Sequence, residues 1–198
     1  MMQTLRTLLS LILLTLALSA CTLLGEPEFR GAVYAEPAPP PDFSLPATTG
    51  GTFTLSEQTE KVILLFFGYT YCPDICPATI GTLKTALNQL SDAERAQITV
   101  VVITVDPERD TLDQLRRYLD TFNAGFIGVV PSLEELAVLK SQYGVVADKD
   151  EIQADGSYTM SHTGVVYGIN RNGDLQVGFF HGTPAEDIAH DLRLLLNP

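Results

Sequence analysis

The sequence predicts an α/β fold with one mixed sheet and helices on both of its faces. Two continuous apolar runs, 62–67 and 98–105, have the composition of strands buried on both sides, and a helical pattern follows each of them. Further along the chain come a hairpin of strands and a last helix. A strand–helix–strand–helix core that ends in a hairpin and a helix indicates a mixed sheet.

The predicted elements follow in chain order. Segment 43–55, with Gly-Gly in its middle, is predicted as a β-hairpin added before the first buried strand. Apolar residues at helical spacing then extend from 77 to 90. After the second buried strand, where β-branched residues dominate, Asp110 is expected to cap a helix over 112–122.

The C-terminal half continues with clear boundary signals. Ser-Leu-Glu-Glu at 132–135 is a capping box that opens a helix reaching about Tyr143. Strands at 163–169 and 175–180, joined by an Asn-Gly turn, predict a hairpin. Thr-Pro-Ala-Glu at 183–186 opens the last helix, with proline at its first position.

The composition narrows the classes of function. The 198 residues carry 12 Lys and Arg against 24 Asp and Glu, a net charge of −12, and no basic run. A nucleic-acid-binding protein needs a cationic face toward the phosphates, so we expect no nucleic-acid partner. The three cysteines are too few for a disulfide-stabilised small domain. The length fits one ordinary domain with terminal extensions.

The N-terminal segment has the features of an export signal. Arg6 precedes the apolar stretch 8–18, which is short for a membrane span but suits a signal peptide. Leu-Ser-Ala-Cys at 18–21 resembles the lipobox of bacterial lipoproteins, which implies a lipoprotein signal peptide at 1–20 and lipidation of Cys21. An uncleaved membrane anchor or an ordinary secretory signal is the alternative. We therefore expect a lipid-anchored protein of the bacterial cell envelope, with its domain on the extracytoplasmic side.

The residues after the signal have the composition of a tether. The run Ala-Glu-Pro-Ala-Pro-Pro-Pro at 35–41 favours extended polyproline II. We therefore assign 21–41 to the lipid anchor and a Pro-rich tether. The globular domain is expected at 42–198, which is long enough to bury a sizeable core.

Cys72 and Cys76 carry the most specific chemistry of the sequence. They lie where the first buried strand ends and a helix begins. Pro77 disfavours helical backbone at Cys76, so we expect a turn that holds both sulfurs near a helix N-terminus. The helix dipole and free amides there favour thiolates. Such thiolates exchange with disulfides or bind a soft metal such as Cu(I).

The spacing of the cysteines leaves both uses open. Three residues separate them, whereas thioredoxin-type reductants have two, and such a turn can close a disulfide or let the sulfurs spread around a metal. Outside the cytosol the pair tends to oxidise unless a metal or a reductant holds it. A two-sulfur metal site needs a further ligand. Of the three histidines, His162 precedes a predicted strand, while His181 and His190 are expected to be structural or solvated.

Three motifs together resemble the Sco/SenC family of copper-delivery proteins. They are the segment around Cys72, Asp-Pro-Glu-Arg-Asp-Thr at 106–111 and Ser-His-Thr at 161–163. The similarity covers essentially the whole globular part, including Ser-Gln-Tyr-Gly-Val at 141–145. The resemblance implies a thioredoxin-like fold on a membrane tether, and a protein that binds copper and helps assemble the binuclear copper centre of cytochrome c oxidase.

Carried over to this sequence, the copper ligands are Cys72, Cys76 and His162. Two thiolates and one imidazole suit Cu(I) in low coordination and tolerate Cu(II) with an added ligand. The implied partners are the copper-bearing subunit of the oxidase and, in addition, other copper chaperones or thiol reductants. Many relatives have an acid directly before this histidine, where Ser161 stands here, so any tuning of the imidazole must come from elsewhere.

The alternative to a copper chaperone is a thiol-disulfide oxidoreductase. In that case Cys72 and Cys76 are catalytic and reduce the cysteines of the recipient. A structural lipoprotein with an inert disulfide is disfavoured, because so short a loop adds little stability through chain entropy.

Residues around the three motifs have several candidate roles. Segment 106–111 either fixes the loop after the second buried strand or serves docking or metal tuning. Met160 either packs or acts as an extra soft ligand. Tyr69 and Tyr71 are expected at the rim of the site.

Overall fold

Two buried parallel strands form the centre of the sheet. In the computed structural model, which describes residues 28–122 and 125–197, β4 (Val62–Gly68) pairs in parallel with β5 (Ile98–Thr104) along its whole length. Every residue of β4 is buried, as are all but the first two residues of β5. The two apolar runs therefore form strands covered on both faces, as predicted.

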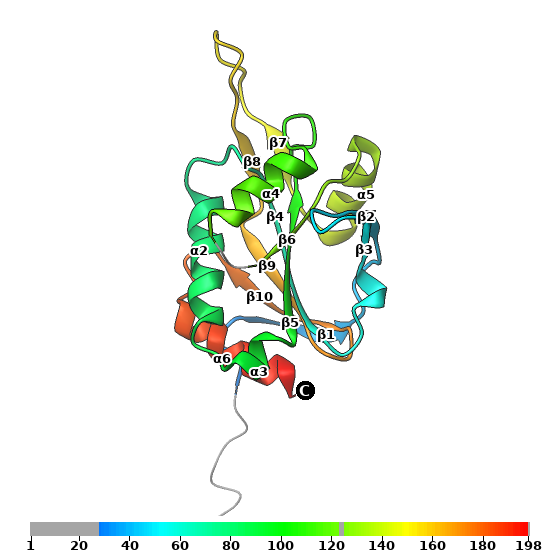
Figure 1. The fold of residues 1–198 in the computed structure, drawn as a ribbon, viewed down its shortest axis with the longest axis vertical. Coiled ribbons are helices and arrows are strands. Elements are labelled where there is room, and N and C mark those ends of the chain that lie inside the picture. The colour runs from blue at the N-terminus through cyan, green and yellow to red at the C-terminus, as the bar shows by residue number, and fades with distance from the viewer. Residues whose placement is uncertain (1–27, 123–124, 198) are drawn as a thin grey trace, which may run out of the picture.

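Four further strands extend this pair into a six-stranded mixed sheet with the order β1-β10-β9-β4-β5-β6 (Figure 1). They are β1 (Ala32–Ala38), β6 (Ile127–Val129), β9 (Val165–Ile169) and β10 (Leu175–Phe180). Strand β6 runs parallel to β5, whereas β9 is antiparallel to β4, and β10 and β1 continue the antiparallel half. This arrangement confirms the predicted fold class.

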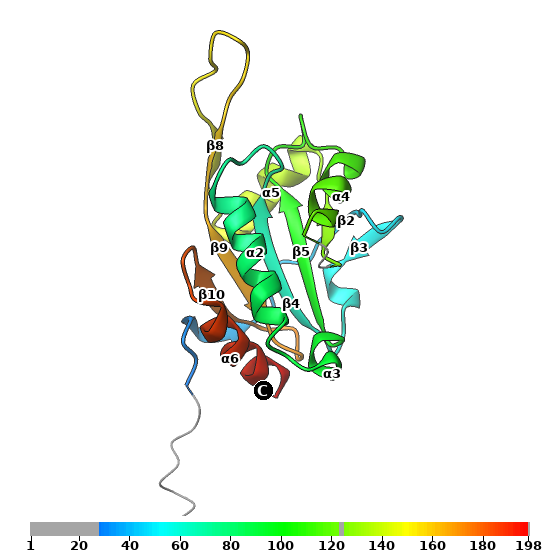
Figure 2. The ribbon, with the colours of Figure 1, turned by 60° about the vertical axis from the view of Figure 1, so that its left-hand side comes forward.

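Helices cover both faces of the sheet. The helices α2 (Ile75–Leu87) and α6 (Ala185–Leu196) pack against each other on one side (Figures 1 and 2). Helix α5 (Leu133–Tyr143) lies on the other side and begins with the capping box predicted from the sequence. Helices that were predicted from the sequence therefore cover both faces of the sheet.

The remaining short elements surround this frame. The N-terminal hairpin predicted at 43–55 is formed by β2 (Ser44–Pro46) and β3 (Thr52–Thr54). A 3-10 turn (Leu55–Glu57) follows it, α3 (Asp92–Arg95) leads into β5, and α4 (Leu112–Asp120) packs against β6. Neither α3 nor β6 was predicted, since each is too short to show a period in the sequence.

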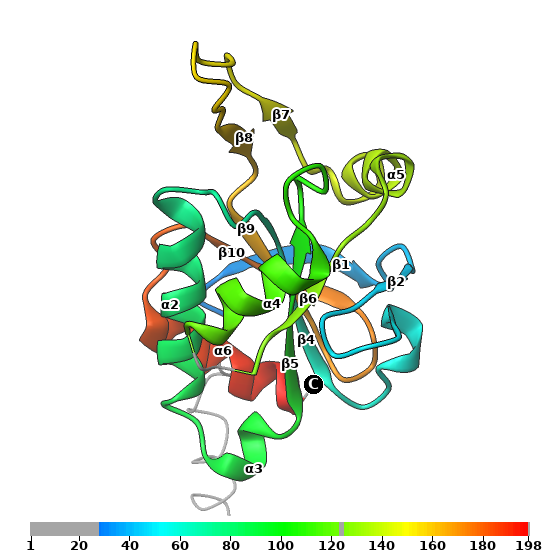
Figure 3. The ribbon, with the colours of Figure 1, turned by 45° about the horizontal axis from the view of Figure 1, so that its top comes forward.

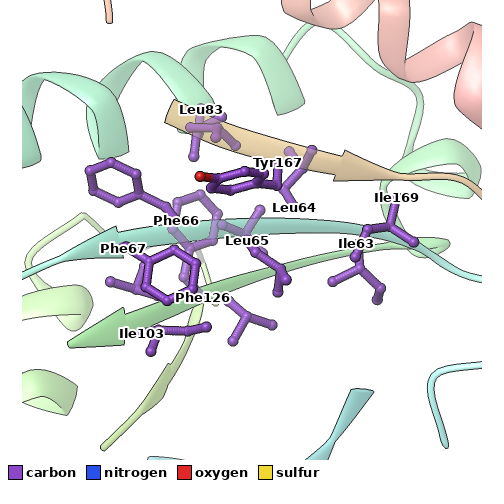
Figure 4. Packing of buried hydrophobic residues seen from close by; sticks show 14 of the residues in the cluster. Ile63, Leu64, Leu65, Phe66, Phe67, Leu83, Ile103, Phe126, Tyr167 and Ile169 are labelled. Carbon is purple, nitrogen blue, oxygen red and sulfur yellow. The ribbon is translucent and has the colours of Figure 1, made fainter. Parts of the chain in front are cut away.

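The core lies between the sheet and its helices. Figure 4 shows side chains of β4 packed with Leu83 of α2, Ile103 of β5, Tyr167 of β9 and Phe126. Successive side chains of a strand point to opposite faces, so β4 contributes to both halves of the core. Burial of each large apolar side chain stabilises the fold by roughly 1.5–3 kcal/mol. The end of β4 is therefore a rigid support for the residues that follow it.

The sheet includes residues that the composition assigned to the tether at 21–41. Strand β1 pairs antiparallel with β10, although all its residues are exposed. The carboxylate of buried Asp191 accepts hydrogen bonds of 2.8–3.0 Å from the amides of Arg30 and Gly31, directly before β1. An edge strand tolerates proline and needs no apolar pattern, so its composition resembles that of a linker. The predicted start of the domain at residue 42 is therefore too late.

Residues 1–27 lie outside the described part of the chain. The predicted signal peptide at 1–20, the lipidation site Cys21 and the first part of the tether fall there and stay predictions. In the described segments, 28–122 and 125–197, no helix is both long enough and apolar enough to cross a membrane.

A long hairpin between α5 and β9 is the largest element that the sequence did not predict. Strands β7 (Ala147–Lys149) and β8 (Met160–His162) pair antiparallel and form a sheet of their own. The hairpin projects from the body of the protein in all three ribbon views (Figures 1, 2 and 3). Its base leads directly into β9.

Candidate metal centre

The topology brings the ends of three segments to one edge of the sheet. The cysteine loop, which we define as residues 69–76, follows the carboxyl end of β4. Because β9 runs antiparallel to β4, the amino end of β9 lies beside that same end, with Val166 opposite Phe66. His162 is the last residue of β8, three residues before β9 begins. Residues ninety positions apart therefore meet here.

The structure places the three candidate ligands in one cluster. One ligand atom from each of Cys72, Cys76 and His162 lies within 4.8 Å of the other two. The Nε2 atom of His162 is 3.3 Å from the sulfur of Cys76 and 4.0 Å from the sulfur of Cys72. Both cysteines are free thiols, Cys76 buried and Cys72 half-buried. The two sulfurs and the imidazole nitrogen are ligand types that a soft metal ion prefers, and they lie close enough together to bind one such ion.

The imidazole of His162 is oriented by its own backbone and by two rings. Its Nδ1 atom lies 3.3 Å from the carbonyl oxygen of Thr163. In the tautomer whose Nδ1–H donates to that oxygen, the Nε2 lone pair is directed at the sulfurs, which is the tautomer that a metal at this position would select. The rings of Tyr69 and Phe66 meet the imidazole edge to face, at centroid distances of 5.7 Å and 6.1 Å. These contacts orient the imidazole, which has no acid directly before it but Ser161.

Hydrogen bonds within the cysteine loop favour the thiolate form of Cys72 over that of Cys76. The amide of Cys76 donates a hydrogen bond to the sulfur of Cys72, at 3.3 Å. The pKa of Cys72 is lowered to about 3, and the largest cause is a hydrogen bond from the neighbouring Cys76 thiol. Partial burial raises this pKa, whereas hydrogen bonds from His162 and from the amides of Cys76 and Asp74 lower it further. The hydrogen bond to the sulfur of Cys72 and then burial raise the pKa of Cys76. These shifts favour the thiolate form at half-buried Cys72 and the thiol form at buried Cys76.

Helix α2 begins earlier than the sequence predicted. It starts at Ile75 rather than at Pro77, so Cys76 lies within its first turn. Proline is tolerated there because the first amides of a helix have no partner inside it. The predicted turn therefore covers only the residues before Ile75, and the expected position of both sulfurs at a helix N-terminus holds.

Gly68 allows the buried sulfur its close approach to β4. A Cβ atom at this position would lie 3.0 Å from the sulfur of Cys76 and 2.7 Å from the ring of Phe66. Real Cβ atoms do not come that close to their neighbours without a shift of one of them. The glycine that ends β4 is therefore required by the packing of the site.

A buried carboxylate fixes the start of the cysteine loop. Asp110 is fully buried and accepts hydrogen bonds from the amide of Thr70 at 3.0 Å, from its hydroxyl at 2.5 Å and from the hydroxyl of Thr104 at 2.6 Å. Burial raises the pKa of Asp110, and these donors oppose the rise. The predicted role of Asp110 as a helix cap is wrong, because Thr111 caps α4 by accepting from the amide of Gln114. The carboxylate of Asp110 instead holds the loop that carries the cysteines.

The other residues that the sequence singled out have structural positions. Met160 is buried in the core cluster, which fits packing. His190 lies on α6 with its Nδ1 atom 2.9 Å from the carboxylate of Asp191, and His181 is exposed after β10. Neither histidine belongs to the cluster of candidate ligands. Tyr71 is half exposed in the cysteine loop, as expected for a residue at the rim, whereas the prediction for Tyr69 is wrong because its side chain is buried in the core.

Sequence reasoning missed the contacts that hold the site together. Neither Thr70 nor Tyr158 was singled out. For segment 106–111, which contains Arg109, the sequence left loop fixing, docking and metal tuning open and indicated no contact partner. Arg109 contacts both the hairpin and the cysteine loop in the structure. No motif or spacing could have shown this, since the partners lie 49 and 38 positions away from it along the chain.

Comparisons with known proteins agree with the motifs. The copper-bound ScoI of Bradyrhizobium japonicum is 32% identical, with a TM-score of 0.72 over 80% of this chain and 99% of that one. Apo Sco1 of Thermus thermophilus is also 32% identical, with a TM-score of 0.75 over 86% of this chain and 99% of that one. These similarities confirm the predicted thioredoxin-like Sco fold.

Sequence relatives point the same way. The mitochondrial SCO2 homolog of Danio rerio is 34% identical over 133 residues, which are 67% of this chain and 48% of that protein. The chain spans about half the length of most of the first curated relatives it matches. The SCO1/SenC family model matches residues 34–197. The chain therefore belongs to the SCO1/SenC family.

Proposed function

We propose that this protein is a membrane-anchored extracytoplasmic copper chaperone that helps assemble the binuclear copper centre of cytochrome c oxidase. One observation carries the proposal: two sulfurs and an imidazole nitrogen lie within 4.8 Å of one another, in a family with copper-bound members of the same fold. Cys72, Cys76 and His162 would be the ligands. Copper is the cargo of this protein rather than a resident cofactor.

The donor set suits a metal that must be both held and released. Thiolate and imidazole ligands select soft and borderline ions, and three protein ligands leave a coordination position open. A ligand of the recipient can enter that position before the donor ligands leave. The Cys76 thiol must lose its proton when the metal binds, so copper affinity is coupled to proton release. The half-buried Cys72 and His162 lie on the side from which a recipient can approach.

The anchor and the location belong to the proposal as well. The lipobox-like residues that end in Cys21 support a lipid anchor in the bacterial cell envelope, with the domain on the extracytoplasmic side. Replacing Cys21 with Ala should release the protein from the membrane fraction. Mass spectrometry of the membrane-bound protein should find a lipid-modified N-terminal cysteine. A protein that stays membrane-bound after that change, with residues 1–20 still attached, would show an uncleaved anchor instead.

A thiol-disulfide oxidoreductase is the second candidate function. Two free thiols, one with a strongly lowered pKa, favour it. In that reaction the Cys72 thiolate attacks a disulfide of the recipient, and Cys76 then resolves the mixed disulfide. The two cysteines of this chain end as a disulfide, and the recipient gains two thiols. The exchange therefore moves two electrons to the recipient, whose two thiols take one proton from Cys76 and one from solvent, and it requires no metal.

One experiment separates the two functions. The soluble copper-binding domain of the oxidase subunit would be offered to this protein in its reduced and in its disulfide form. A chaperone transfers Cu(I) to the reduced form, and His162→Ala abolishes the transfer. A reductase reduces the disulfide form with copper chelated, and His162→Ala leaves the rate unchanged. Titration of Cu(I) and Cu(II) into the wild type and into Cys72→Ala, Cys76→Ala and His162→Ala tests the ligand set itself.

A further inference from the structure

The position of His162 depends on contacts at the base of its hairpin. Strands β7 and β8 form a two-stranded sheet outside the main sheet, and the residues between them are mostly exposed. A two-stranded hairpin is at best marginally stable by itself in water. Contacts between the hairpin and the body of the protein must therefore decide where the imidazole lies before a metal enters.

Arg109 makes several of these contacts from the loop after β5. Its guanidinium stacks on the ring of Tyr158, with Cζ 3.5 Å from the ring centroid, and its Nη1 donates to the carbonyl oxygen of Tyr158 at 2.9 Å. Tyr158 lies four residues before His162, in the returning arm of the hairpin just before β8 begins. The same guanidinium lies 4.7 Å from the ring centroid of Tyr71, one residue before Cys72. One side chain therefore contacts the histidine hairpin and the cysteine loop.

A buried acid holds Arg109 in this place. The Nε of Arg109 donates to one carboxylate oxygen of Asp106 at 2.5 Å, and the hydroxyl of Tyr158 donates to the other at 2.9 Å. The side chain of Asp106 is fully buried. A buried carboxylate requires such partners, so the ion pair and the Tyr158 hydroxyl are fixed together. Planar stacking and a forked set of donors are properties of arginine that lysine lacks.

We propose that Arg109 is a positioning residue of the metal site, which keeps His162 at the two sulfurs by holding Tyr158 and Tyr71 on one guanidinium. The inference rests on the proposed copper-binding function. Arg109 contributes no ligand. It raises the fraction of molecules in which the hairpin already has the metal-binding arrangement, and apparent affinity scales with that fraction.

The variants follow from the contacts. Arg109→Lys keeps the positive charge beside Asp106. It loses the planar guanidinium that stacks on Tyr158 and the several N–H donors of that group. Tyr71→Leu removes only the cysteine-loop side of the contact, at an exposed position that the fold tolerates. Arg116→Lys is the matched control, since Arg116 is an exposed arginine of α4 paired with Asp113. Each change is made in the full chain, with and without His162→Ala.

The decisive measurement is the Cu(I) dissociation constant in competition with a chromophoric chelator. We expect Arg109→Lys to raise it about tenfold and Tyr71→Leu about threefold, because the competent fraction falls by those factors. In the His162→Ala background both changes should alter it less than about twofold, because no imidazole remains to be positioned. Arg116→Lys should have no effect in either background. An equal effect of Arg109→Lys in both backgrounds, or none in the wild type, would overturn the proposal.

A readout without metal separates this proposal from the proposed function. Amide hydrogen exchange of residues 158–163 in the copper-free protein should be faster in Arg109→Lys than in the wild type. If exchange is faster in Arg109→Lys but the wild type binds no copper, the proposed chaperone function is contradicted, while the positioning role of Arg109 in the copper-free fold stands. Unchanged exchange would contradict that role even if copper binds.

Discussion

Cys76 and His162 face each other across the candidate metal site, but the structure holds them by different means. The cysteine loop follows a fully buried strand, is fixed by buried Asp110, and places Cys76 in the core. The hairpin that ends in His162 projects from the body of the protein (Figure 3). Ile152, in the segment between its two strands, is 62% exposed.

This difference assigns separate tasks to the ligands. Core packing leaves the sulfur of Cys76 little freedom, so in the proposed copper site this sulfur is the most firmly placed ligand. Polar and stacking contacts at a hairpin base open more easily than a packed core. On the proposed function, His162 is therefore the ligand expected to dissociate first when a recipient ligand enters.

The largest effect is expected from the buried sulfur. Cys76→Ser replaces a soft thiolate with a hydroxyl and should weaken Cu(I) binding by about 1000-fold, or ~4 kcal/mol. His162→Ala should weaken it less, by about 100-fold, because the two sulfurs remain. Competition titrations of both variants measure the difference. A greater loss for His162→Ala than for Cys76→Ser would reverse the comparison between the two segments.

The reactivity of Cys72 tests the electrostatics of the loop. Because its pKa is lowered to about 3, Cys72 should be a thiolate throughout pH 5–8. Its alkylation by iodoacetamide should then be nearly independent of pH in this range, whereas an ordinary thiol reacts about tenfold faster with each pH unit up to its pKa near 8.5.

The Cys76→Ser variant is the control for that measurement. It removes the thiol that does most to lower the pKa of Cys72, so the pKa should rise and the alkylation rate should regain its dependence on pH. Mass spectrometry of the singly modified protein gives both rates. A tenfold rise per pH unit in the wild type would mean that Cys72 is protonated at neutral pH.

A substitution at Gly68 disturbs the packing around Cys76 and leaves the histidine hairpin unchanged. Gly68→Ala forces a methyl group against Cys76 and Phe66 and should destabilise the fold by about 1–3 kcal/mol, with weaker copper binding. Gly81→Ala is the matched control, because a Cβ at this position of α2 meets nothing within 4 Å. That change should stabilise the helix by up to about 1 kcal/mol. Denaturant unfolding compares the two, and equal stability of both variants would contradict the packing argument.

The smallest effect is expected at Ser161. Its hydroxyl donates to exposed Asp150 at 2.6 Å, across the hairpin, and the imidazole of His162 is oriented by the carbonyl of Thr163 instead. Ser161→Ala should therefore change the Cu(I) affinity less than about twofold. A tenfold loss would show that this hydroxyl tunes the metal site after all.

The frame of the fold could be predicted because its signals are local. The apolar runs that form β4 and β5, the capping box at Ser132 and the hairpin turn after β9 each depend on residues close in sequence. The ligands were identified by a resemblance carried by three short motifs. The cysteine pair alone left disulfide exchange and metal binding equally open.

The features that escaped prediction depend on distant partners. Strand β1 has the composition of a linker and becomes a strand only because β10 offers it an edge. Asp110 precedes a helix, as a capping residue does, but its carboxylate accepts hydrogen bonds from Thr70, forty positions away. The role of Arg109 requires rings from two other segments. Tertiary contacts of this kind leave no period or spacing in the sequence.

X-ray absorption spectroscopy at the copper edge, on the Cu(I)-loaded protein, tests the central claim most directly. We predict a first shell of two sulfur atoms and one imidazole nitrogen in the wild type. His162→Ala should lose the imidazole contribution and keep both sulfurs. A first shell made of sulfur alone in the wild type, or an imidazole signal that survives the loss of His162, would contradict a site formed by Cys72, Cys76 and His162.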